Sequence, residues 1–348
     1  MSTVGQKIII FKTDRVGDFL HLTGCIKTIS ENFPNAHITL VCNKRNYQLA
    51  KNYSIFNSFI LIDEFGLIKT LLLNFKSFFN TFYDHLFILD AKKRSFMISC
   101  FVKSKNKNTI CFVKKKKIFG FSYSVSRPNQ IILKKKFNNY VFSDEDYSNT
   151  EIVYQNLYFQ LLKQINLKIN SKQNFFVPDP NFKEIFNSFY NKHLKKKYYL
   201  IHVDERWDKF NSKDILNTIN LIKFISKKNF VLISTGAVSF SFLNEFVKNF
   251  PTYEFLNNAF CESNSLKFHN VCLIKFMPLN LLAYFIGNSK KNISAHTGPI
   301  LNISSALNIE VIDIIKNIKF NELGRWIPLV SKYKRFSFED LENHMNDF

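Results

Sequence analysis

Glycine is scarce in this sequence, with nine residues in 348. No G-x-G-x-x-G pattern follows the first apolar segment of either half, which argues against a nicotinamide-dependent oxidoreductase. Three of the few glycines, Gly17, Gly236 and Gly298, come at bends after apolar runs. Such bends need a positive φ or a close approach of the backbone to a ligand, so they are the first places to look for a site.

Cysteine and histidine patterns typical of metal sites are also missing. The six cysteines are scattered without a C-x-x-C pair, each in apolar surroundings. The eight histidines show neither H-x-H nor H-E-x-x-H spacing. We therefore expect reduced, buried thiols in a cytoplasmic protein, with no metal site and no cofactor.

Long apolar runs are absent as well. The longest candidate, residues 66–82, is interrupted by Lys69 and Lys76, and a membrane-spanning helix needs about 20 apolar residues. The N-terminus runs directly into a strand-like segment with charges at both ends, so we expect neither a signal peptide nor a membrane-crossing segment.

Acidic residues are few beside basic ones, 27 against 48, which gives a net charge of +21. Almost all of the basic residues are lysines. This excess fits either a solvated surface or attraction to a polyanion, which could be nucleic acid, an anionic membrane or a phosphorylated glycolipid. A basic nucleic-acid-binding protein is the main alternative from another class, but no RNP, KH, zinc-finger or helix-turn-helix pattern is present.

What the sequence does contain is a regular alternation of strand-like and helix-like segments. Strands are predicted at 7–12, 37–42, 58–62, 85–90 and 109–113, and helices at 18–32, 45–50, 67–82, 94–102 and 148–164. After a proline-containing stretch at 166–182, further strands follow at 198–203, 230–234, 272–275, 292–294 and 310–314. The length and the rhythm predict two doubly wound α/β domains facing each other across a cleft, with ligands at the carboxyl ends of the strands.

The segment TDRVGDF places a carboxylate, Asp18, where the first predicted strand gives way to a helix. Asp18 could cap the helix N-terminus or act as a general base on a substrate hydroxyl. Gly17 predicts a tight turn before it. Arg15 could hold a phosphate or carboxylate through two hydrogen bonds, or form an exposed ion pair with Asp14.

A second candidate site lies in ISAHTGPILNISSALN, residues 293–308. A strand ends there, a Thr-Gly-Pro turn follows, and a helix opens with small residues. Thr297 and the backbone amides near Gly298 make this a candidate diphosphate-binding turn. His296 could take part or be a buried, hydrogen-bonded side chain.

Three segments together resemble glycosyltransferase family 9, the ADP-heptose:lipopolysaccharide heptosyltransferases. IIIFKTDRVGDFLHLTGCIKTISENFPNAHITLVC is similar to the family's opening strand, [LT]-D-R-[IV]-G-D motif and F-P-x-A-x-I-T-L segment. YDHLFILDAKKRS and AHTGPILNISSALNIEVI resemble two later family segments, in the same order. The resemblance implies the GT-B fold, with a Rossmann-like acceptor domain at 1–175, a Rossmann-like nucleotide-sugar domain at 176–335, and a C-terminal helix at 336–348 that could pack back on the first domain.

The resemblance also implies an inverting, metal-independent glycosyltransferase. It would move heptose or a related sugar from a nucleotide donor, ADP-linked by first choice, to lipopolysaccharide or a related glycolipid or glycan. Asp18 matches the general base. The expected acceptor-side residues are Arg15, Gly17 and Arg94, and the expected nucleotide-sugar residues are Arg206, Met277, His296, Thr297 and Gly298.

Three positions depart from the family pattern. His296 stands where the motif has an aspartate, and Leu301 where it has a histidine. In HVDERWDKF, Glu205 replaces the family's lysine and leaves Arg206 as the candidate phosphate contact. A different nucleotide-sugar donor, or a relative without activity, is therefore an alternative.

The acceptor of this family implies a location. An anionic glycolipid at the inner face of the cytoplasmic membrane would make the chain a cytoplasmic protein in peripheral contact with that surface, with no nucleic acid as a partner. The lysine-rich segments CFVKKKKIFGF and IILKKKF would supply basic contacts. The helix predicted over 67–82 would supply apolar ones through Leu71, Phe75, Phe78, Phe79 and Phe82, for which core packing is the alternative.

Overall fold

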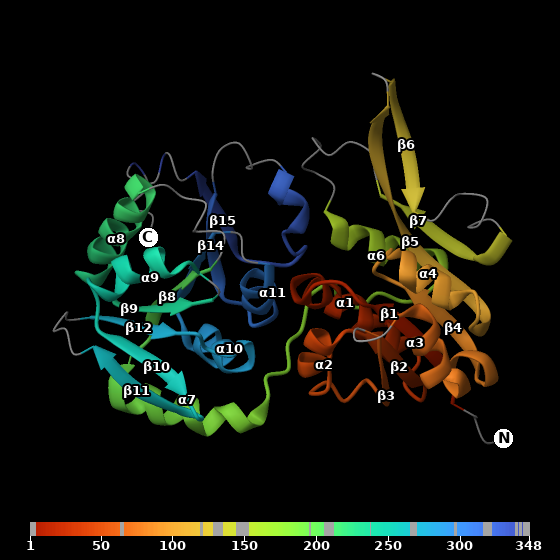
Figure 1. The fold of residues 1–348 in the computed structure, drawn as a ribbon, viewed down its shortest axis with the longest axis horizontal. Helices are drawn as coiled ribbons and strands as arrows, with labels where there is room; N and C mark the ends of the chain where they lie inside the picture. Colours follow the sequence, from red (N-terminus) through yellow and green to blue (C-terminus); the bar gives the residue numbers. More distant parts are fainter. Residues whose placement is uncertain are drawn as a thin grey trace. The chain divides into compact units, whose positions relative to one another are not determined.

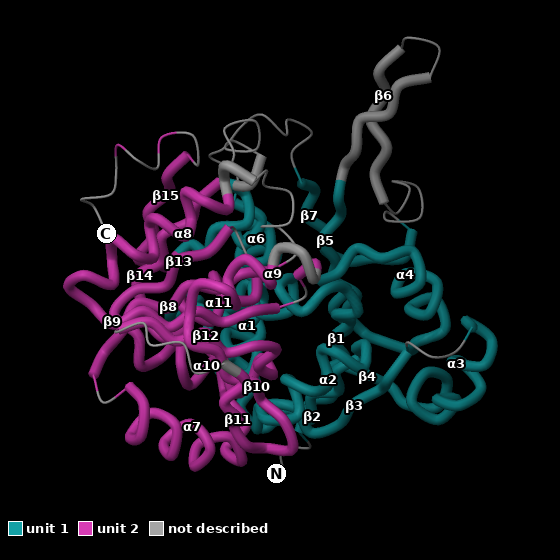
Figure 2. The backbone as a smooth tube through the Cα atoms, turned by 60° about the vertical axis from the view of Figure 1, so that its left-hand side comes forward, with its two compact units in different colours: residues 1–174, 324–329 teal, residues 175–323, 330–348 magenta. Residues whose placement is uncertain are grey.

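The computed structural model describes residues 5–62, 66–118, 121–127, 135–143, 153–194, 196–204, 212–236, 238–264, 270–295, 298–315, 322–337, 340 and 343. The chain divides into two compact units, residues 1–174 with 324–329 (unit 1) and residues 175–323 with 330–348 (unit 2), which Figure 2 colours separately. The sequence predicts a division after residue 175 and a terminal helix at 336–348. The segment that rejoins unit 1 is instead 324–329, and most of 336–348 lies outside the described residues.

Unit 1 is built on a largely parallel sheet (Figure 1). Its strands are β1 (Lys7–Lys12), β2 (His37–Cys42), β3 (Ser58–Leu61), β4 (Phe82–Ile88), β5 (Lys103–Ile118), β6 (Phe121–Arg127) and β7 (Asn139–Phe142). The first half of β5 pairs in parallel with β4 and β7, and its second half pairs antiparallel with β6. The parallel strands therefore follow the order β3-β2-β1-β4-β5-β7.

Helices cover both faces of this sheet. They are α1 (Val16–Asn32), α2 (Lys44–Ala50), α3 (Leu67–Leu73), α4 (Lys93–Ser99) and α6 (Tyr154–Gln164), with a π-helical turn, η1 (Lys76–Asn80). Ile9 and Phe11 belong to the core cluster that also contains side chains of η1 and α4. Ile8 and Ile10 are equally buried and, because side chains alternate along a strand, face the opposite side of the sheet.

The prediction of a single helix over 67–82 is wrong. The structure has two separate helical segments there, α3 and η1, and Phe82 is already the first residue of β4. Phe78 of η1 and Tyr83 of β4 are both buried in the core cluster of unit 1. Packing in this core therefore favours a strand from Phe82 onward, although the spacing of apolar residues predicts a helix up to that residue. Among the described residues, no helix has both the length and the apolar character needed to cross a membrane.

Unit 2 repeats the architecture. Its strands are β8 (Tyr198–Val203), β9 (Phe230–Thr235), β10 (Thr252–Leu256), β11 (Ala259–Asn264), β12 (Val271–Lys275), β13 (Lys291–Ser294), β14 (Glu310–Ile315) and β15 (Tyr333–Ser337). They follow the order β11-β10-β12-β9-β8-β13-β14-β15, and all pairs are parallel except β10 with β11. The sequence does not predict β10, β11 or β15.

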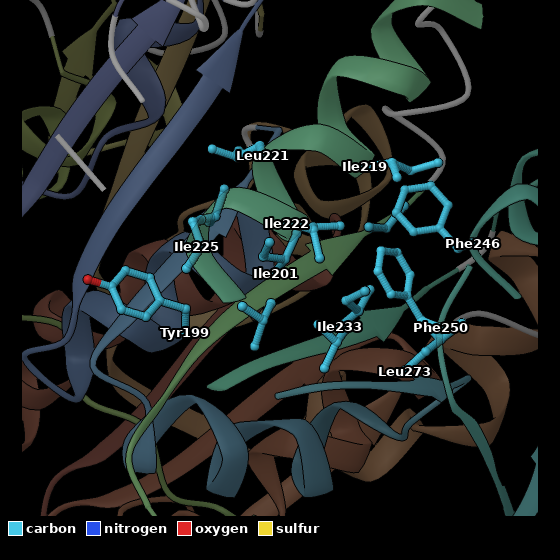
Figure 3. Close-up of a cluster of buried hydrophobic side chains, with 14 of the residues drawn as sticks. Tyr199, Ile201, Ile219, Leu221, Ile222, Ile225, Ile233, Phe246, Phe250 and Leu273 are labelled. Carbon is cyan, nitrogen blue, oxygen red and sulfur yellow. The ribbon is translucent and has the colours of Figure 1, made fainter. Parts of the chain in front are cut away.

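The core of unit 2 lies on both faces of its sheet. Side chains of α8 (Ser212–Ser226) and α9 (Phe240–Val247) lie over those of β8, β9 and β12, including Ile201, Ile233 and Leu273 (Figure 3). On the other face are α7 (Lys183–Phe189), α10 (Leu279–Asn288) and α11 (Gly298–Ala306), which pack in the order α7-α10-α11. The strands are covered on both sides, which explains why they read as nearly continuous apolar runs.

Both units have one topological switch point at an equivalent place. In unit 1 the chain winds from β1 to β2 and β3 on one side, and to β4, β5 and β7 on the other. In unit 2 it winds from β8 to β9 and β12, and then to β13, β14 and β15. Open parallel sheets bind ligands at the carboxyl ends of the strands where the winding reverses, so the ends of β1 with β4 and of β8 with β13 are the expected sites.

Candidate functional site

The chain that leaves β1 is fixed to the end of β4 by Asp90. One oxygen of its carboxylate accepts hydrogen bonds from the Thr13 N–H at 3.0 Å, the Thr13 hydroxyl at 2.6 Å and the Ser95 hydroxyl at 2.7 Å. The other oxygen accepts from the Lys92 N–H at 3.0 Å. Asp90 is buried, and these bonds satisfy its carboxylate while joining β1, β4 and the start of α4 at the switch point.

Lys12 is a fully buried cation at the last position of β1. Its ammonium group donates to the Asp14 carboxylate at 2.8 Å, to the Leu89 carbonyl at 3.0 Å and to the Tyr158 hydroxyl at 3.2 Å. The second oxygen of Asp14 is buried and has no hydrogen-bond partner in the described part of the chain. The ion pair of Asp14 is thus with Lys12 and not, as one alternative from the sequence had it, with Arg15, which is exposed.

Burial and charge perturb both members of this pair. Burial raises the pKa of Asp14, the charge of Lys12 opposes the rise, and Asp18 and Asp90 add to it, which leaves the pKa at about 7. Burial alone would lower the pKa of Lys12, but the charges of Asp14, Tyr158 and Asp18 outweigh it and hold that pKa well above its usual value. Burial likewise raises the pKa of the Tyr158 hydroxyl well above its usual value. The pKa of Asp14 at this switch point is therefore set by its burial together with the charges of Lys12, Asp18 and Asp90.

Two asparagines hold the backbone of the same segment. The Asn43 amide donates to the carbonyls of Thr13 at 3.1 Å and Asp14 at 2.6 Å. The Asn46 amide donates to the carbonyls of Lys12 at 3.1 Å and Asp14 at 3.2 Å. The start of α2 therefore fixes the backbone of the turn between β1 and α1, which is the preorganisation that a binding or catalytic group requires.

Asp18 follows the connection between β1 and α1 and lies in the first turn of the helix α1. The N-cap position is taken by Arg15, and no side chain caps the helix, so Asp18 is not the N-cap residue. The helix begins at Val16, so the tight turn predicted at Gly17 is wrong and Gly17 is helical. Since Asp18 is only partly buried, its carboxylate combines a favourable place near the positive end of the helix with access to solvent.

Arg94, expected on the acceptor side, lies in the first turn of α4 and is half-buried. Its guanidinium group donates to the Thr70 hydroxyl of α3 at 2.6 Å. Just before α4, Ala91 has a φ of 48°. Arg94 thus follows β4 closely in the chain and lies near the switch point. The hydrogen bond of its guanidinium group, however, is to a residue of the neighbouring helix α3.

In unit 2, the carboxyl end of β8 carries His202, which is buried. Its Nδ1 is 2.8 Å from the Ser234 hydroxyl at the end of β9, and burial lowers the pKa of His202 to about 4. A side chain at Gly236 would lie only 3.2 Å from the Asp204 Cβ and 3.3 Å from the His202 Nε2. The glycine predicted to mark a bend therefore lies in a tightly packed place at this edge, where a larger residue would displace its neighbours slightly.

Met277, one of the expected nucleotide-sugar residues, follows β12 and is almost fully buried. The residue before it, Phe276, has a φ of 54°, and its N–H donates to the Thr235 hydroxyl at 3.1 Å. Apart from Ala91 and Phe276, every non-glycine residue of positive φ in the described chain is an asparagine, which tolerates this region. The backbone is therefore strained just after β4 and just after β12, as is common at functional sites.

In the turn after β13 the structure describes Ala295 and then Gly298, which is the first residue of α11. Its carbonyl accepts from the Asn302 amide at 2.7 Å. Leu301, which stands where the resembled motif has a histidine, is fully buried in the core of unit 2, so it cannot contact a phosphate. Of the expected nucleotide-sugar residues, Arg206, His296 and Thr297 lie outside the described residues.

Sequence reasoning assigned no role to Lys12, Asp90 or Asn46. Each had a recognisable signal, because Lys12 and Asp90 are charged residues directly at the end of buried apolar strands, and Asn46 lies inside a short helix. A charged side chain in such a position is rarely buried unless it is paired. Their roles become visible only when β1, β4 and α2 are placed next to one another.

The fold of the chain can be compared with those of solved structures. Two units with largely parallel sheets, one wound outward from β1 and the other from β8, match the GT-B fold. No protein-family model matches the sequence, and no curated protein sequence matches it. The comparison with known proteins therefore depends on solved structures.

These structures include a glycosyl transferase family 9 protein from Veillonella parvula, similar with a TM-score of 0.71 and 11% identity over 100% of this chain and 90% of that one. Escherichia coli heptosyltransferase WaaC with ADP has a TM-score of 0.64 and 12% identity over 98% and 99% of the two chains. E. coli ADP-heptose lps heptosyltransferase II has a TM-score of 0.61 and 13% identity over the same shares. The resemblance predicted from the sequence is confirmed at the level of the fold.

Proposed function

We propose that the chain is an inverting glycosyltransferase in which Asp18 is the general base. The observation that carries the proposal is the position of Asp18, in the first turn of α1 beside the switch point of a unit with the heptosyltransferase fold. The bonds from Asp90, Asn43 and Asn46 to the preceding turn support it, because they hold the backbone that positions the carboxylate.

The proposed reaction is a single displacement at the anomeric carbon of the donor sugar. Asp18 takes the proton from an acceptor hydroxyl as its oxygen bonds to that carbon, and the bond to the nucleoside diphosphate breaks with inversion. Backbone amides at the start of α11, near Gly298, and the Arg206 guanidinium stabilise the charge on the departing diphosphate. In this scheme amides and cationic side chains take the place of a divalent metal.

The proposed donor is an ADP-linked heptose or a related nucleotide sugar. WaaC, which shares the fold, has been solved with ADP and with ADP-2-deoxy-2-fluoro heptose. At Glu205, His296 and the buried Leu301 the chain differs from the family pattern, so a donor would meet other polar groups there. A sugar linked to a nucleotide other than ADP is therefore the alternative donor. Calorimetric titration with ADP-, GDP-, UDP- and CMP-linked sugars decides between them.

The proposed acceptor is an anionic glycolipid, lipopolysaccharide or a related glycan, at the inner face of the cytoplasmic membrane. The net charge of +21 supports this choice, because juxtamembrane lysines contribute about 1 kcal/mol each near an anionic surface. Peripheral contact of a cytoplasmic protein with that membrane is part of the proposal.

The test of the base is Asp18→Asn. We expect turnover to fall by about a hundredfold or more, with the donor dissociation constant unchanged, because removing a general base affects the chemical step. Glu31→Gln is the matched control, since Glu31 is a carboxylate in the last turn of the same helix, and it should leave turnover unchanged. Full turnover in Asp18→Asn would remove the base assignment, and absence of any nucleotide-sugar binding by the wild type would remove the proposed function.

A further inference from the structure

Large apolar side chains exposed to solvent concentrate in one part of unit 1. Eight of the thirteen such side chains in the described chain lie between residues 61 and 101, although this segment is a small share of the sequence. They are Leu61, Ile68, Leu72, Leu73, Phe75, Phe82, Met97 and Phe101, which are 41–75% exposed. Concentrated exposure of this kind marks an interaction surface in a folded protein.

The helix α3 is apolar on its inner and outer sides alike. Leu67 and Leu71, one turn apart, pack against the core cluster of unit 1. Ile68 and Leu72, also one turn apart, point the other way and are 75% and 68% exposed. Apolar side chains on a helix are normally covered by a neighbouring element or a partner, and in the described part of the chain Ile68 and Leu72 remain mostly exposed.

The exposed apolar side chains of this segment lie on and beside two neighbouring helices, α3 and α4. The two helices lie side by side (Figure 2) and are joined by the bond from Arg94 to Thr70. The Phe75 ring stacks on Phe79 with centroids 4.8 Å apart, and Phe79 lies 5.5 Å from Phe101. We call Ile68, Leu72, Leu73, Phe75, Met97 and Phe101 the α3–α4 apolar surface.

The exposed charges described around this surface are mostly positive. Exposed lysines lie within and beside it, at positions 69, 76, 92, 93, 103 and 105. The only acidic residues between positions 66 and 107 are Asp84, which accepts a hydrogen bond from the Lys7 N–H, and the buried Asp90. A second copy of the chain docked here would bring lysine against lysine, whereas an anionic surface would neutralise them.

We infer that the α3–α4 apolar surface rests on an anionic lipid bilayer. Its Ile, Leu and Phe side chains enter the boundary between headgroups and acyl chains, and the surrounding lysines meet anionic headgroups. The basis is exposure and charge alone, so the inference holds whether or not the chain transfers sugar. Together with the proposed function, it specifies which surface of unit 1 contacts the membrane that carries the acceptor.

The structure also corrects which side chains of 67–82 are available for such contact. Phe78 is fully buried, and Leu71 and Phe79 pack against the core, as the core-packing alternative holds. Phe75 and Phe82 are exposed. The apolar contacts of the inferred surface therefore come mostly from residues that the sequence did not single out.

Flotation of the full chain with lipid vesicles tests the inference. We expect binding to vesicles of phosphatidylcholine mixed with phosphatidylglycerol, weakened by salt, and little binding to phosphatidylcholine alone. Ile68→Ser with Leu72→Ser should weaken binding by about tenfold for each side chain removed. Lys69→Glu with Lys76→Glu should abolish the preference for the anionic vesicles.

The matched control is Leu216→Ser with Leu256→Ser, two leucines of unit 2 that are 56% and 53% exposed. This pair should leave vesicle binding unchanged, and thermal unfolding should show that all variants are folded, because each altered side chain is exposed. Equal loss of binding in the control pair, or no binding by the wild type, overturns the inference. So does a dimer in light scattering that Ile68→Ser with Leu72→Ser dissociates, since a second copy would then be the cover.

Discussion

Lys12 combines two features that rarely occur together, a full positive charge and no exposed surface. A buried ammonium group is tolerated when all its donors are used, and here Asp14, Leu89 and Tyr158 take them. Replacing such a cluster by apolar residues would often cost no stability. We therefore interpret Lys12 as a residue that fixes the turn before Asp18 and keeps negative charge there.

The pKa of Asp14 predicts a pH dependence of stability. The folded value is about 7 and the ordinary value is 3.8, so the folded chain holds this proton more tightly. The stability that Asp14 contributes is complete below pH 3.8 and is lost as the pH rises through about 7. We expect Asp14→Asn to reduce the fall in unfolding free energy between pH 5 and 8 by about 2–4 kcal/mol, measured by urea unfolding.

Neighbouring groups do not obscure this effect. Lys12 and Tyr158 keep their protons throughout this range because the pKa of each lies far above it. Asn has nearly the shape of a protonated Asp, so it removes the titration and keeps an acceptor for Lys12. An Asp14→Asn variant with the same pH profile as the wild type would show that Asp14 does not titrate in this range.

The sequence shows part of the candidate site because some of its signals are local. Asp18 after an apolar strand, and Gly298 at the start of a helix, can be read from their neighbours in the chain. The partners of Asp90 cannot be read in this way, because its bonds to Thr13 join residues that are 77 positions apart. The strained backbone at Phe276 has no sequence signal either, since nothing nearby indicates that φ is positive.

At the scale of elements, strands with continuous apolar sequences are easier to predict than strands with mixed sequences. The strands β1, β2 and β8 have the predicted bounds because burial on both faces makes them continuous apolar runs. The strands β11 and β15 lie at the edges of the second sheet, and their sequences AFCESN and YKRFS mix polar and apolar residues. Half-exposed strands of this kind give no clear periodic signal over so few residues.

Two helical glycines give a prediction at the same scale. A Cβ on Gly24 of α1 would lie 2.8 Å from the Gln173 carbonyl oxygen and 3.1 Å from that of Lys172. Backbone atoms of this connection cannot move as a side chain can, so we expect Gly24→Ala to lower the unfolding free energy by about 1–3 kcal/mol. Denaturant unfolding followed by circular dichroism measures the change.

Gly287 of α10 is the matched control. A Cβ there would meet only the Leu307 side chain, at 3.4 Å. Helix propensity then dominates, and Gly287→Ala should raise the unfolding free energy by about 0.5–1 kcal/mol. If both substitutions stabilise the protein, α1 does not pack against residues 172–173 as closely as the structure has it.

At the scale of the whole molecule, both units are built on largely parallel sheets, but they are not two consecutive stretches of the chain, because residues 324–329 return to unit 1. This segment belongs to unit 1, although it follows the whole of the second sheet except β15. Arg325 is buried and lies 5.9 Å from the centre of the Tyr154 ring, and the Leu329 N–H donates to the Gln155 side chain at 2.7 Å. Contacts between residues so far apart in the chain leave no local pattern, so the sequence could not predict the return.

The return segment can be tested by tryptophan fluorescence. The chain has two tryptophans, Trp207 and Trp326, so Trp207→Phe leaves Trp326 as the only one. The Trp326 ring lies 4.5 Å from Tyr154 and 6.1 Å from His21, both in unit 1. Although it comes late in the sequence, its signal should report the unfolding of residues 1–174.

We therefore expect Gly24→Ala, made in the Trp207→Phe background, to lower the denaturant midpoint of Trp326 fluorescence. A loss of about 1–3 kcal/mol shifts the midpoint in urea by about 1 M, given the usual dependence of stability on denaturant. Gly287→Ala in unit 2 should not lower that midpoint. If Gly24→Ala leaves the midpoint of Trp326 fluorescence unchanged, residues 324–329 do not pack on unit 1. The chain would then consist of two consecutive domains, with no late segment that belongs to unit 1.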